Sequence, residues 1–276
     1  MNSNRELWEK GDFTRIAATM RRSGEALVAG LGVGKGSKML DLGCGDGTTA
    51  LPAARLGADV LGVDIAANLV AAGEARAAAE GLANVRFQQG DACELVAVND
   101  GRFDLVLSVF GAMFAPRPDD VAKEMVRVAK PGGRIVMGNW IPDDPTLVAQ
   151  ILRIAATYSP PPPDGFVSPM AWGVEDEVIE RFGAAGIAAD QISFDHASWD
   201  FEYDGTPEEM VSNFADYYGP TMNAFAAAAA DDREGLLRAE LDALFASQNQ
   251  AIDGTSIAAT FLLVNVSVPI IEEMVR

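Results

Sequence analysis

The chain has 276 residues, 49% of them hydrophobic, which suffices for one large domain with a buried core. Its 40 acidic and 21 basic residues give a net charge of −19, and so acidic a surface repels phosphate backbones, which argues against nucleic acid as a partner. No apolar run approaches the roughly 20 residues of a membrane span, which argues against a membrane protein.

Strand and helix signals alternate between residues 38 and 140. Five short apolar runs predict strands, and alanine-rich or amphipathic segments between them predict helices. Nearly continuous apolar strands spaced by helices are typical of a parallel sheet covered on both faces. The predicted strands are residues 38–42, 59–64, 85–88, 103–109 and 134–140, and the predicted helices are 48–56, 68–80 and 119–129.

After residue 140 the alternation loosens. Between the last two predicted strands, apolar residues keep helical spacing on both sides of Gly219 and Pro220. We therefore expect a helical cap insertion, residues 205–255, over the C-terminal edge of a doubly wound, mostly parallel α/β sheet of seven strands. The other elements predicted in this part are helices 145–158 and 174–185 and strands 192–203 and 258–268.

A glycine-rich segment, DLGCGDG at residues 41–47, joins the first predicted strand to the first predicted helix. Glycines let the backbone turn sharply and approach a ligand, and the following helix N-terminus offers free amide donors. The G-x-G-x-G spacing departs from the G-x-G-x-x-G of dinucleotide-binding proteins. A carboxylate beside the loop is unfavourable near a pyrophosphate but suits a cationic ligand, such as the sulfonium and ammonium groups of S-adenosylmethionine. Taken alone, the segment is also compatible with a plain strand-to-helix turn.

Four further segments follow this loop in order: Val63-Asp64-Ile65, Gly90-Asp91-Ala92, residues 103–110 and residues 130–134. With DLGCGDG they resemble the motifs of the class I S-adenosylmethionine-dependent methyltransferases, in the small-molecule subset of the ubiquinone/menaquinone type. The resemblance covers residues 38–140, and the rest of the chain matches only in architecture. It implies a Rossmann-like enzyme that transfers the methyl group of S-adenosylmethionine to a nucleophilic atom of a small molecule, leaving S-adenosylhomocysteine.

The chain is expected to form a single domain with five parts. The N-terminal part is expected to fold as a helical lid over the cofactor, and the substrate is expected to lie against the later parts. The parts are an N-terminal helical lid (1–37), a cofactor-binding core (38–140), the second half of the sheet (141–204), the helical cap (205–255), and the last strand and tail (256–276).

Individual roles also follow from the resemblance. A carboxylate at Asp64, at a strand end, can accept hydrogen bonds from both ribose hydroxyls, with Ile65 and Leu69 packed on the adenine. Asp91 is expected to accept from the adenine amino group beside the Ala92 amide, although Asp91 also fits a cap at a helix N-terminus. The predicted cofactor-binding residues are Phe13, Asp41, Gly43, Cys44, Gly45, Asp64, Ile65, Leu69, Asp91, Ala92, Ser108, Phe110 and Met113.

No catalytic residue is assigned, because alignment of the reactants and exclusion of water can supply most of the rate. His196, the single histidine, lies in an alternating strand and fits a partly exposed strand position better than a general base. Phe114, Trp172, Tyr217 and Tyr218 are aromatic residues that either contact the ligands or belong to the core.

Several alternatives stay open at this point. A nicotinamide-dependent oxidoreductase is disfavoured by the loop spacing and by the lack of a Tyr-x-x-x-Lys pair. A binder of S-adenosylmethionine without methyl transfer, a protein methyltransferase, and a homodimer built through the cap all remain compatible with the sequence. Two cysteines, one histidine and a polar N-terminus indicate a cytoplasmic protein with neither a disulfide framework nor a metal site.

Overall fold

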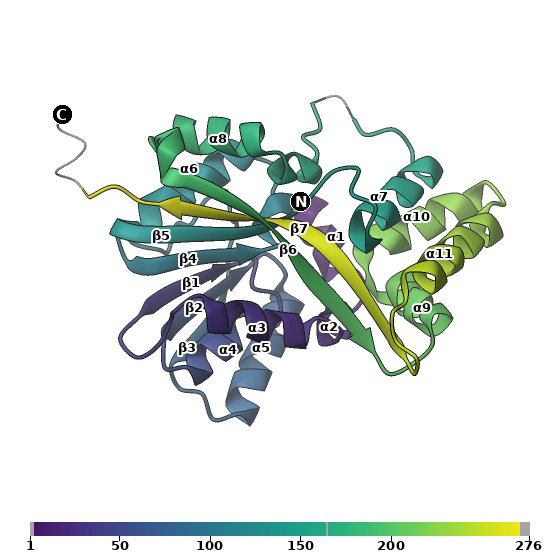
Figure 1. The fold of residues 1–276 in the computed structure, drawn as a ribbon, viewed down its shortest axis with the longest axis horizontal. Coiled ribbons are helices and arrows are strands. Elements are labelled where there is room, and N and C mark those ends of the chain that lie inside the picture. The colour runs from purple at the N-terminus through teal and green to yellow at the C-terminus, as the bar shows by residue number, and fades with distance from the viewer. Residues whose placement is uncertain (1–2, 164, 271–276) are drawn as a thin grey trace.

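The computed structural model describes residues 3–163 and 165–270. Its centre is a seven-stranded sheet of order β3-β2-β1-β4-β5-β7-β6, in which only β7 runs antiparallel to its neighbours (Figure 1). The predicted α/β class and mostly parallel sheet are therefore confirmed. The strands are β1 (Lys38–Leu42), β2 (Asp59–Asp64), β3 (Val85–Gln89), β4 (Phe103–Val109), β5 (Ala129–Trp140), β6 (Ile192–Tyr203) and β7 (Thr255–Ser267).

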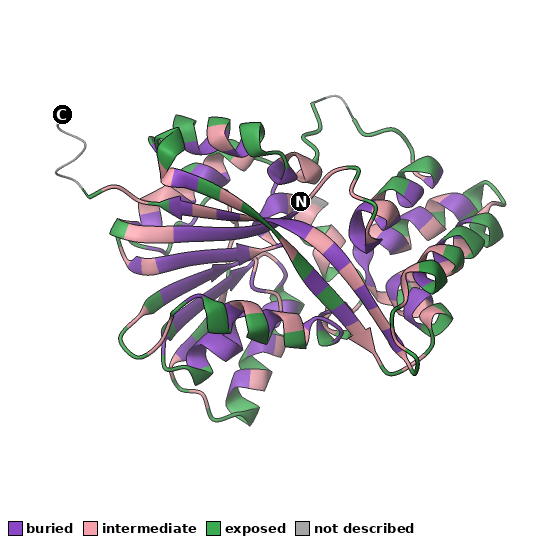
Figure 2. Ribbon diagram, in the orientation of Figure 1, coloured by how far each residue is buried: buried purple, intermediate pink, exposed green. Residues whose placement is uncertain are grey.

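Helices cover both faces of the sheet, which explains why its central strands are buried almost throughout (Figure 2). One face packs on α3, α4 and α5, and the other packs on α6 and α8. Two short helices, α1 and α2, precede α3. The bounds are α1 (Ser3–Glu9), α2 (Phe13–Ala18), α3 (Arg21–Gly30), α4 (Ala50–Arg55), α5 (Ala67–Ala79), α6 (Pro118–Val128) and α8 (Glu175–Ala184), with 3-10 turns at Ala112–Phe114, Pro169–Gly173 and Ala189–Gln191.

The start of β5 differs most from the sequence prediction, since the strand begins at Ala129 and not at residue 134. Its pairing with β4 shifts register between Phe103 and Leu105, which marks a bulge. Gly132 lies in this irregular stretch at φ +75°, and its N–H donates to the carbonyl of Val268 at 3.0 Å. The helix before this segment ends at Val128, and the Pro-Gly-Gly segment itself lies within β5.

The cap insertion lies between β6 and β7, as predicted, and consists of α9 (Pro207–Tyr217), α10 (Gly219–Ala230) and α11 (Glu234–Gln248). α10 and α11 pack on α7 (Leu147–Tyr158), and α9 packs on α10 and α11, beyond the C-terminal ends of the parallel strands (Figure 1). Thr206 begins the cap with a reciprocal capping box, since its backbone N–H donates to Glu209 Oε2 at 2.8 Å and its hydroxyl accepts from the Glu209 N–H at 3.3 Å. The core on the α6 side of the sheet continues into the cap through residues such as Phe214.

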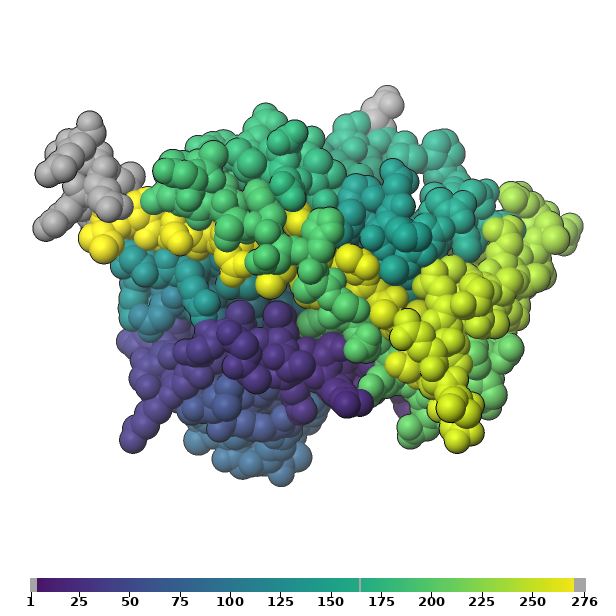
Figure 3. Space-filling model, viewed as in Figure 1, coloured from purple at the N-terminus to yellow at the C-terminus, as the bar shows by residue number. Residues whose placement is uncertain are grey.

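The N-terminal segment is hydrogen-bonded to β6. Ser23 Oγ and the backbone of Asp200 exchange two hydrogen bonds of 3.1 and 2.9 Å, and the N–H of Glu202 donates to the carbonyl of Thr19 at 2.8 Å. Figure 3 shows this segment, in purple, against β6, in green. The first and last thirds of the chain therefore meet at the edge where the parallel strands end.

Candidate functional site

A cavity of about 910 Å³, its open mouth included, lies where the strand order reverses between β1 and β4. In doubly wound sheets this switch point, at the carboxyl ends of the strands, is where ligands bind. Ten of the thirteen predicted residues line the cavity, and they come from the ends of β1 to β4, from α2 and from the start of α5. These ten are Phe13, Gly43, Cys44, Gly45, Asp64, Ile65, Leu69, Asp91, Ala92 and Phe110.

The floor of this cavity is a contact between two backbones. A Cβ placed on Gly111 would lie 2.4 Å from the carbonyl oxygen of Gly43, and one placed on Gly43 would lie 2.6 Å from Gly111 Cα. Gly43 also adopts φ +71°, a conformation that favours glycine. The loops after β1 and β4 therefore touch at a point where neither leaves room for a side chain.

Asp64 fixes the glycine loop to the end of β2. Its Oδ2 accepts from the N–H of Gly45 at 2.8 Å, and its Oδ1 accepts from the N–H of Ala66 at 2.9 Å. Burial raises the pKa of Asp64, and the backbone hydrogen bonds oppose that rise. Because a carboxylate has about four acceptor sites, two amide bonds leave capacity for hydroxyl donors of a ligand.

Asp91 follows β3 at a turn and not at the N-terminus of a helix, so of the two roles that the sequence left open the helix cap is not observed, and adenine recognition stays a prediction. It lines the cavity, and its Oδ1 accepts from the N–H of Cys93 at 2.9 Å, which stabilises the turn after β3. The carboxyl group thus positions its own loop while one side of the residue faces the cavity.

Three predicted residues lie behind the cavity wall, which corrects the expectation that they line it. Asp41 is 1% exposed, accepts from Thr49 Oγ1 at 2.6 Å, and has a pKa raised by burial to about 7. Ser108 donates to the carbonyl of Leu42 at 2.7 Å and accepts from the N–H of Ala112 at 3.0 Å. Met113 is buried in the core. These side chains support the loops and do not face the ligand space.

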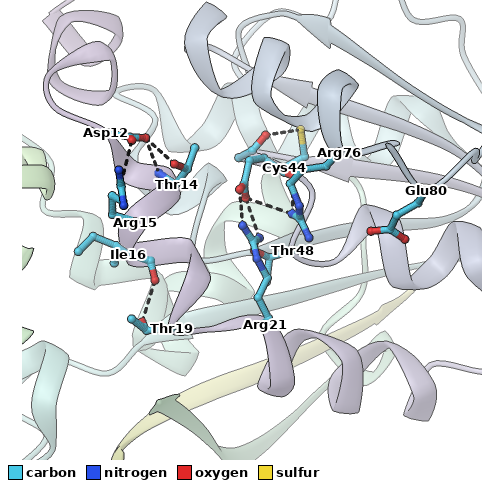
Figure 4. Close-up of polar contacts among 12 residues, drawn as sticks. Asp12, Thr14, Arg15, Ile16, Thr19, Arg21, Cys44, Thr48, Arg76 and Glu80 are labelled. Atoms are coloured by element: carbon cyan, nitrogen blue, oxygen red, sulfur yellow. Dashed lines mark hydrogen bonds and ion pairs between the residues drawn. The ribbon is translucent and has the colours of Figure 1, made fainter. Parts of the chain in front are cut away.

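The second acid of the glycine loop, Asp46, is neutralised from two helices. Arg21 of α3 reaches both of its carboxylate oxygens, one of them at 2.8 Å, and also contacts Thr48. Arg76 of α5 donates to the Asp46 carbonyl at 2.7 Å. Figure 4 shows Arg21, Arg76 and Thr48 converging on the loop beside Cys44. This cluster leaves no local pattern in the sequence, because its arginines are separated from the loop by 20 residues or more.

The N-terminal helices form one wall of the cavity. Asp12 caps α2 by accepting from the N–H of Thr14 at 3.2 Å (Figure 4), which turns Phe13 toward the cavity. Trp8 of α1 lines the same wall and meets Phe13 edge to face, with ring centroids 5.5 Å apart. Phe13 therefore lines the cavity, and its contact with the cofactor stays a prediction, whereas Trp8 was not among the predicted residues.

Phe110 sits in a strained conformation at the end of β4. Its φ is +58°, which costs energy for a residue other than glycine, and such strain often marks functional sites. The ring stacks on Trp140 with centroids 3.6 Å apart and meets the edge of Trp199 at 5.0 Å. Trp199 also lines the cavity, and its buried indole N–H has no hydrogen-bond partner among the described residues.

The remaining candidates lie elsewhere. His196 is exposed on β6 opposite Leu262 and does not line the cavity. Trp172 is buried beneath the guanidinium of Arg181, at 4.8 Å from its ring, and belongs to the core. Within the part of the chain that the structure describes, no group of His, Cys, Asp and Glu side chains is arranged to hold a metal. No described helix has the length and apolar character to cross a membrane.

Asp64→Ala is expected to weaken binding of S-adenosylhomocysteine by roughly tenfold to a hundredfold, because the variant loses a charged acceptor and frees the Gly45 amide. Isothermal titration calorimetry on the folded variant measures this loss. Asp59→Ala, an exposed aspartate at the other end of β2, is the matched control. Equal affinities of Asp64→Ala and the wild type would remove Asp64 from the site.

Comparison with known proteins agrees with this geometry. The model of a family described as "Methyltransferase domain" matches residues 40–137. An uncharacterized protein of Mycobacterium tuberculosis is 34% identical over 227 residues, which cover 81% of this chain and 79% of that protein. A ubiquinone biosynthesis O-methyltransferase of Acinetobacter baumannii is 36% identical over 100 residues, or 36% of this chain and 42% of that protein.

Among solved structures, the YcgJ protein of Bacillus subtilis has a TM-score of 0.59 at 21% identity over 90% of this chain and 98% of its own. Phosphoethanolamine N-methyltransferase 2 of Haemonchus contortus, solved with S-adenosylhomocysteine, has a TM-score of 0.57 at 21% identity over 90% of this chain and 52% of its own. At such identities the likeness concerns the fold. The ordered motifs, the sheet topology and the matched family together show that this chain belongs to the class I S-adenosylmethionine-dependent methyltransferases.

Proposed function

We propose that this protein holds S-adenosylmethionine in the cavity between β1 and β4 and transfers its methyl group to a nucleophilic atom of a small molecule in the cytoplasm. The observation that carries the proposal is the convergence of the glycine loop, Asp64 and Asp91 on one cavity. A small acceptor is also favoured by the net charge of −19, which opposes nucleic acid. Two free, buried cysteines suit a reducing compartment.

The residues around the cavity fit this cofactor chemically. A Cβ on Gly45 would meet no atom within 4 Å, so the loop leaves open space beside its backbone. Asp64 retains acceptor capacity for ribose hydroxyls, and Ile65 and Leu69 offer an apolar surface for the adenine. The unpartnered N–H of Trp199 suits a polar group of a ligand.

When bound, S-adenosylmethionine supplies an electrophilic methyl group on a sulfonium. The chain itself contributes orientation and exclusion of water, because Trp8, Phe13 and Phe110 close the cavity with aromatic surface. Three acids line the cavity: Asp46 is paired with arginines, Asp64 accepts from backbone amides, and Asp91 accepts from the N–H of Cys93. We therefore assign positioning to these residues and no general base to the site.

The N-terminal helices and the cap are proposed to act together as a cover. Leu7 of α1 packs on Gly219, and a Cβ on Gly219 would lie 2.4 Å from the Leu7 carbonyl oxygen. Gly11 packs equally closely on Met222, because a Cβ on Gly11 would lie 2.7 Å from Met222 Sδ. Both contacts fall at the joint between α9 and α10. A movement of this joint would therefore move the wall that carries Trp8 and Phe13.

Hydrogen exchange tests this cover. We expect S-adenosylhomocysteine to slow amide exchange in α1, in α2 and at the joint between α9 and α10, while exchange in β2 and β4 is slow with or without ligand. Exchange in the cap that never changes with ligand, together with a subunit contact through α10 and α11, would identify the cap as a dimer interface and not a cover.

The proposed reaction is tested by incubating the protein with S-adenosylmethionine labelled in its methyl group and a metabolite extract. Mass spectrometry should find a product that is heavier by the labelled methyl group and absent when the protein is omitted. A protein that binds the cofactor but labels no small molecule in extracts of several sources would instead be a binder, or an enzyme that acts on proteins.

A further inference from the structure

A second cavity of about 390 Å³, its mouth included, adjoins the first. The two share four lining residues, Trp8, Phe13, Met20 and Phe110, which therefore lie where the cavities meet. From these residues the second cavity extends toward α7, β5, β6 and α9. We call it the aromatic chamber. Its position places it between the cofactor cavity and the cap.

The walls of the aromatic chamber carry no charge. Eight of its twelve lining residues are aromatic, and the other four are aliphatic or methionine. These rings pack on one another both face to face and edge to face, since Phe110 stacks on Trp140 and Trp8 meets Phe114 at a centroid distance of 5.0 Å. Aromatic pairs favour offset and edge-to-face arrangements, so a flat aromatic ring is a chemically suitable partner for these walls. A charged molecule would lose its hydration in the chamber without gaining an ion pair.

Tyr218 supplies the single hydroxyl group of this lining. The residue is 6% exposed, and no hydrogen bond to its hydroxyl is formed by any residue that the structure describes. Burial raises the pKa of Tyr218, so the phenol stays neutral and can both donate and accept. Its ring is held by Phe13 and Phe214 at centroid distances of 6.1 and 5.6 Å. A buried hydroxyl in an apolar chamber gains most from a polar atom on the molecule that enters.

We propose that the aromatic chamber is the acceptor site and takes a neutral, flat, aromatic small molecule whose polar edge lies near the Tyr218 hydroxyl. This inference rests on the proposed function, because the chamber acquires its role from the cofactor cavity beside it. The inference limits the acceptors to neutral molecules, because the uncharged walls exclude acceptors that carry a phosphate, a carboxylate or an ammonium group.

The test compares two probes that share the naphthalene ring, 2-naphthol and 2-naphthoate, by isothermal titration calorimetry in the presence of saturating S-adenosylhomocysteine. The neutral 2-naphthol should bind, and the anionic 2-naphthoate should bind at least tenfold more weakly. Equal binding of the two probes, or no binding of 2-naphthol to a protein that binds S-adenosylhomocysteine, would overturn the inference. Failure of S-adenosylhomocysteine itself to bind would count against the proposed function instead.

Two variants locate the probe. Ile151→Trp fills the chamber from α7 and should abolish 2-naphthol binding while S-adenosylhomocysteine still binds, whereas Ala156→Trp, exposed on the same helix, should change neither. Tyr218→Phe removes one oxygen and should weaken 2-naphthol roughly three- to tenfold without affecting naphthalene. If 2-naphthol binds Ile151→Trp or Tyr218→Phe as it binds the wild type, the probe lies elsewhere and the inference fails.

Discussion

Replacing Gly111 by alanine is expected to destabilise the folded protein by roughly 3 kcal/mol, the upper end of the usual cost of overpacking, and to impair cofactor binding. The added methyl group would lie 2.4 Å from the carbonyl oxygen of Gly43. Because the obstacle is backbone and not the end of a flexible side chain, the two loops must separate. They carry Cys44, Gly45 and Phe110 on the cavity wall, so the separation would change the cavity itself.

Gly183→Ala is the matched control. Gly183 is exposed in α8, and a Cβ there would meet no atom within 4 Å. Alanine at a helical position should leave stability unchanged or raise it by roughly 0.5–1 kcal/mol. Urea unfolding of both variants measures the difference. A Gly111→Ala protein as stable as Gly183→Ala, with unaltered S-adenosylhomocysteine affinity, would contradict the described contact between the loops.

Asp41→Asn is expected to change how stability depends on pH. The pKa of Asp41 is raised by burial from 3.8 to about 7, so its protonated form is favoured in the folded protein. The stability from this group is fully present below pH 3.8 and is lost as pH rises toward 7. Asparagine stays neutral and can still accept from Thr49. The variant should therefore gain on the wild type by roughly 3 kcal/mol between pH 4 and pH 7.

Urea unfolding at several pH values across this window measures the gain as a difference between two proteins. Asp59→Asn, the same substitution at an exposed position of the neighbouring strand, controls for the change of net charge. An Asp41→Asn curve that runs parallel to the wild-type curve from pH 4 to pH 7 would mean that Asp41 is ionised at little cost in the folded protein.

The architecture was predictable because its signals are local. β1, β2 and β4 are buried on both faces, so each is a nearly continuous apolar run. The cap was predictable because its apolar residues keep helical spacing. The start of β5 was not, because the Pro-Gly-Gly segment indicates a turn while pairing with neighbouring strands draws it into the sheet.

The strand ends that carry the candidate site could be predicted from the sequence, but the side chains that face the cavity could not. Asp64 is the last residue of β2, and it lines the cavity. Asp41 comes one residue before the end of β1, and its carboxyl group is hydrogen-bonded to Thr49, away from the cavity. Successive side chains of a strand point to opposite faces, and the sequence does not tell which face opens on the cavity. Trp8 and Trp199 come from distant segments, so only the tertiary structure brings them to the site.

Isothermal titration calorimetry of the purified protein with S-adenosylhomocysteine, followed by the same titration with NADH, tests the central claim most directly. The geometry of the glycine loop, Asp64 and Asp91 predicts saturable binding of S-adenosylhomocysteine at one site per chain, and no heat with NADH. Folded protein that binds NADH, or that takes up no S-adenosylhomocysteine at millimolar concentration, would contradict the claim that this cavity holds S-adenosylmethionine.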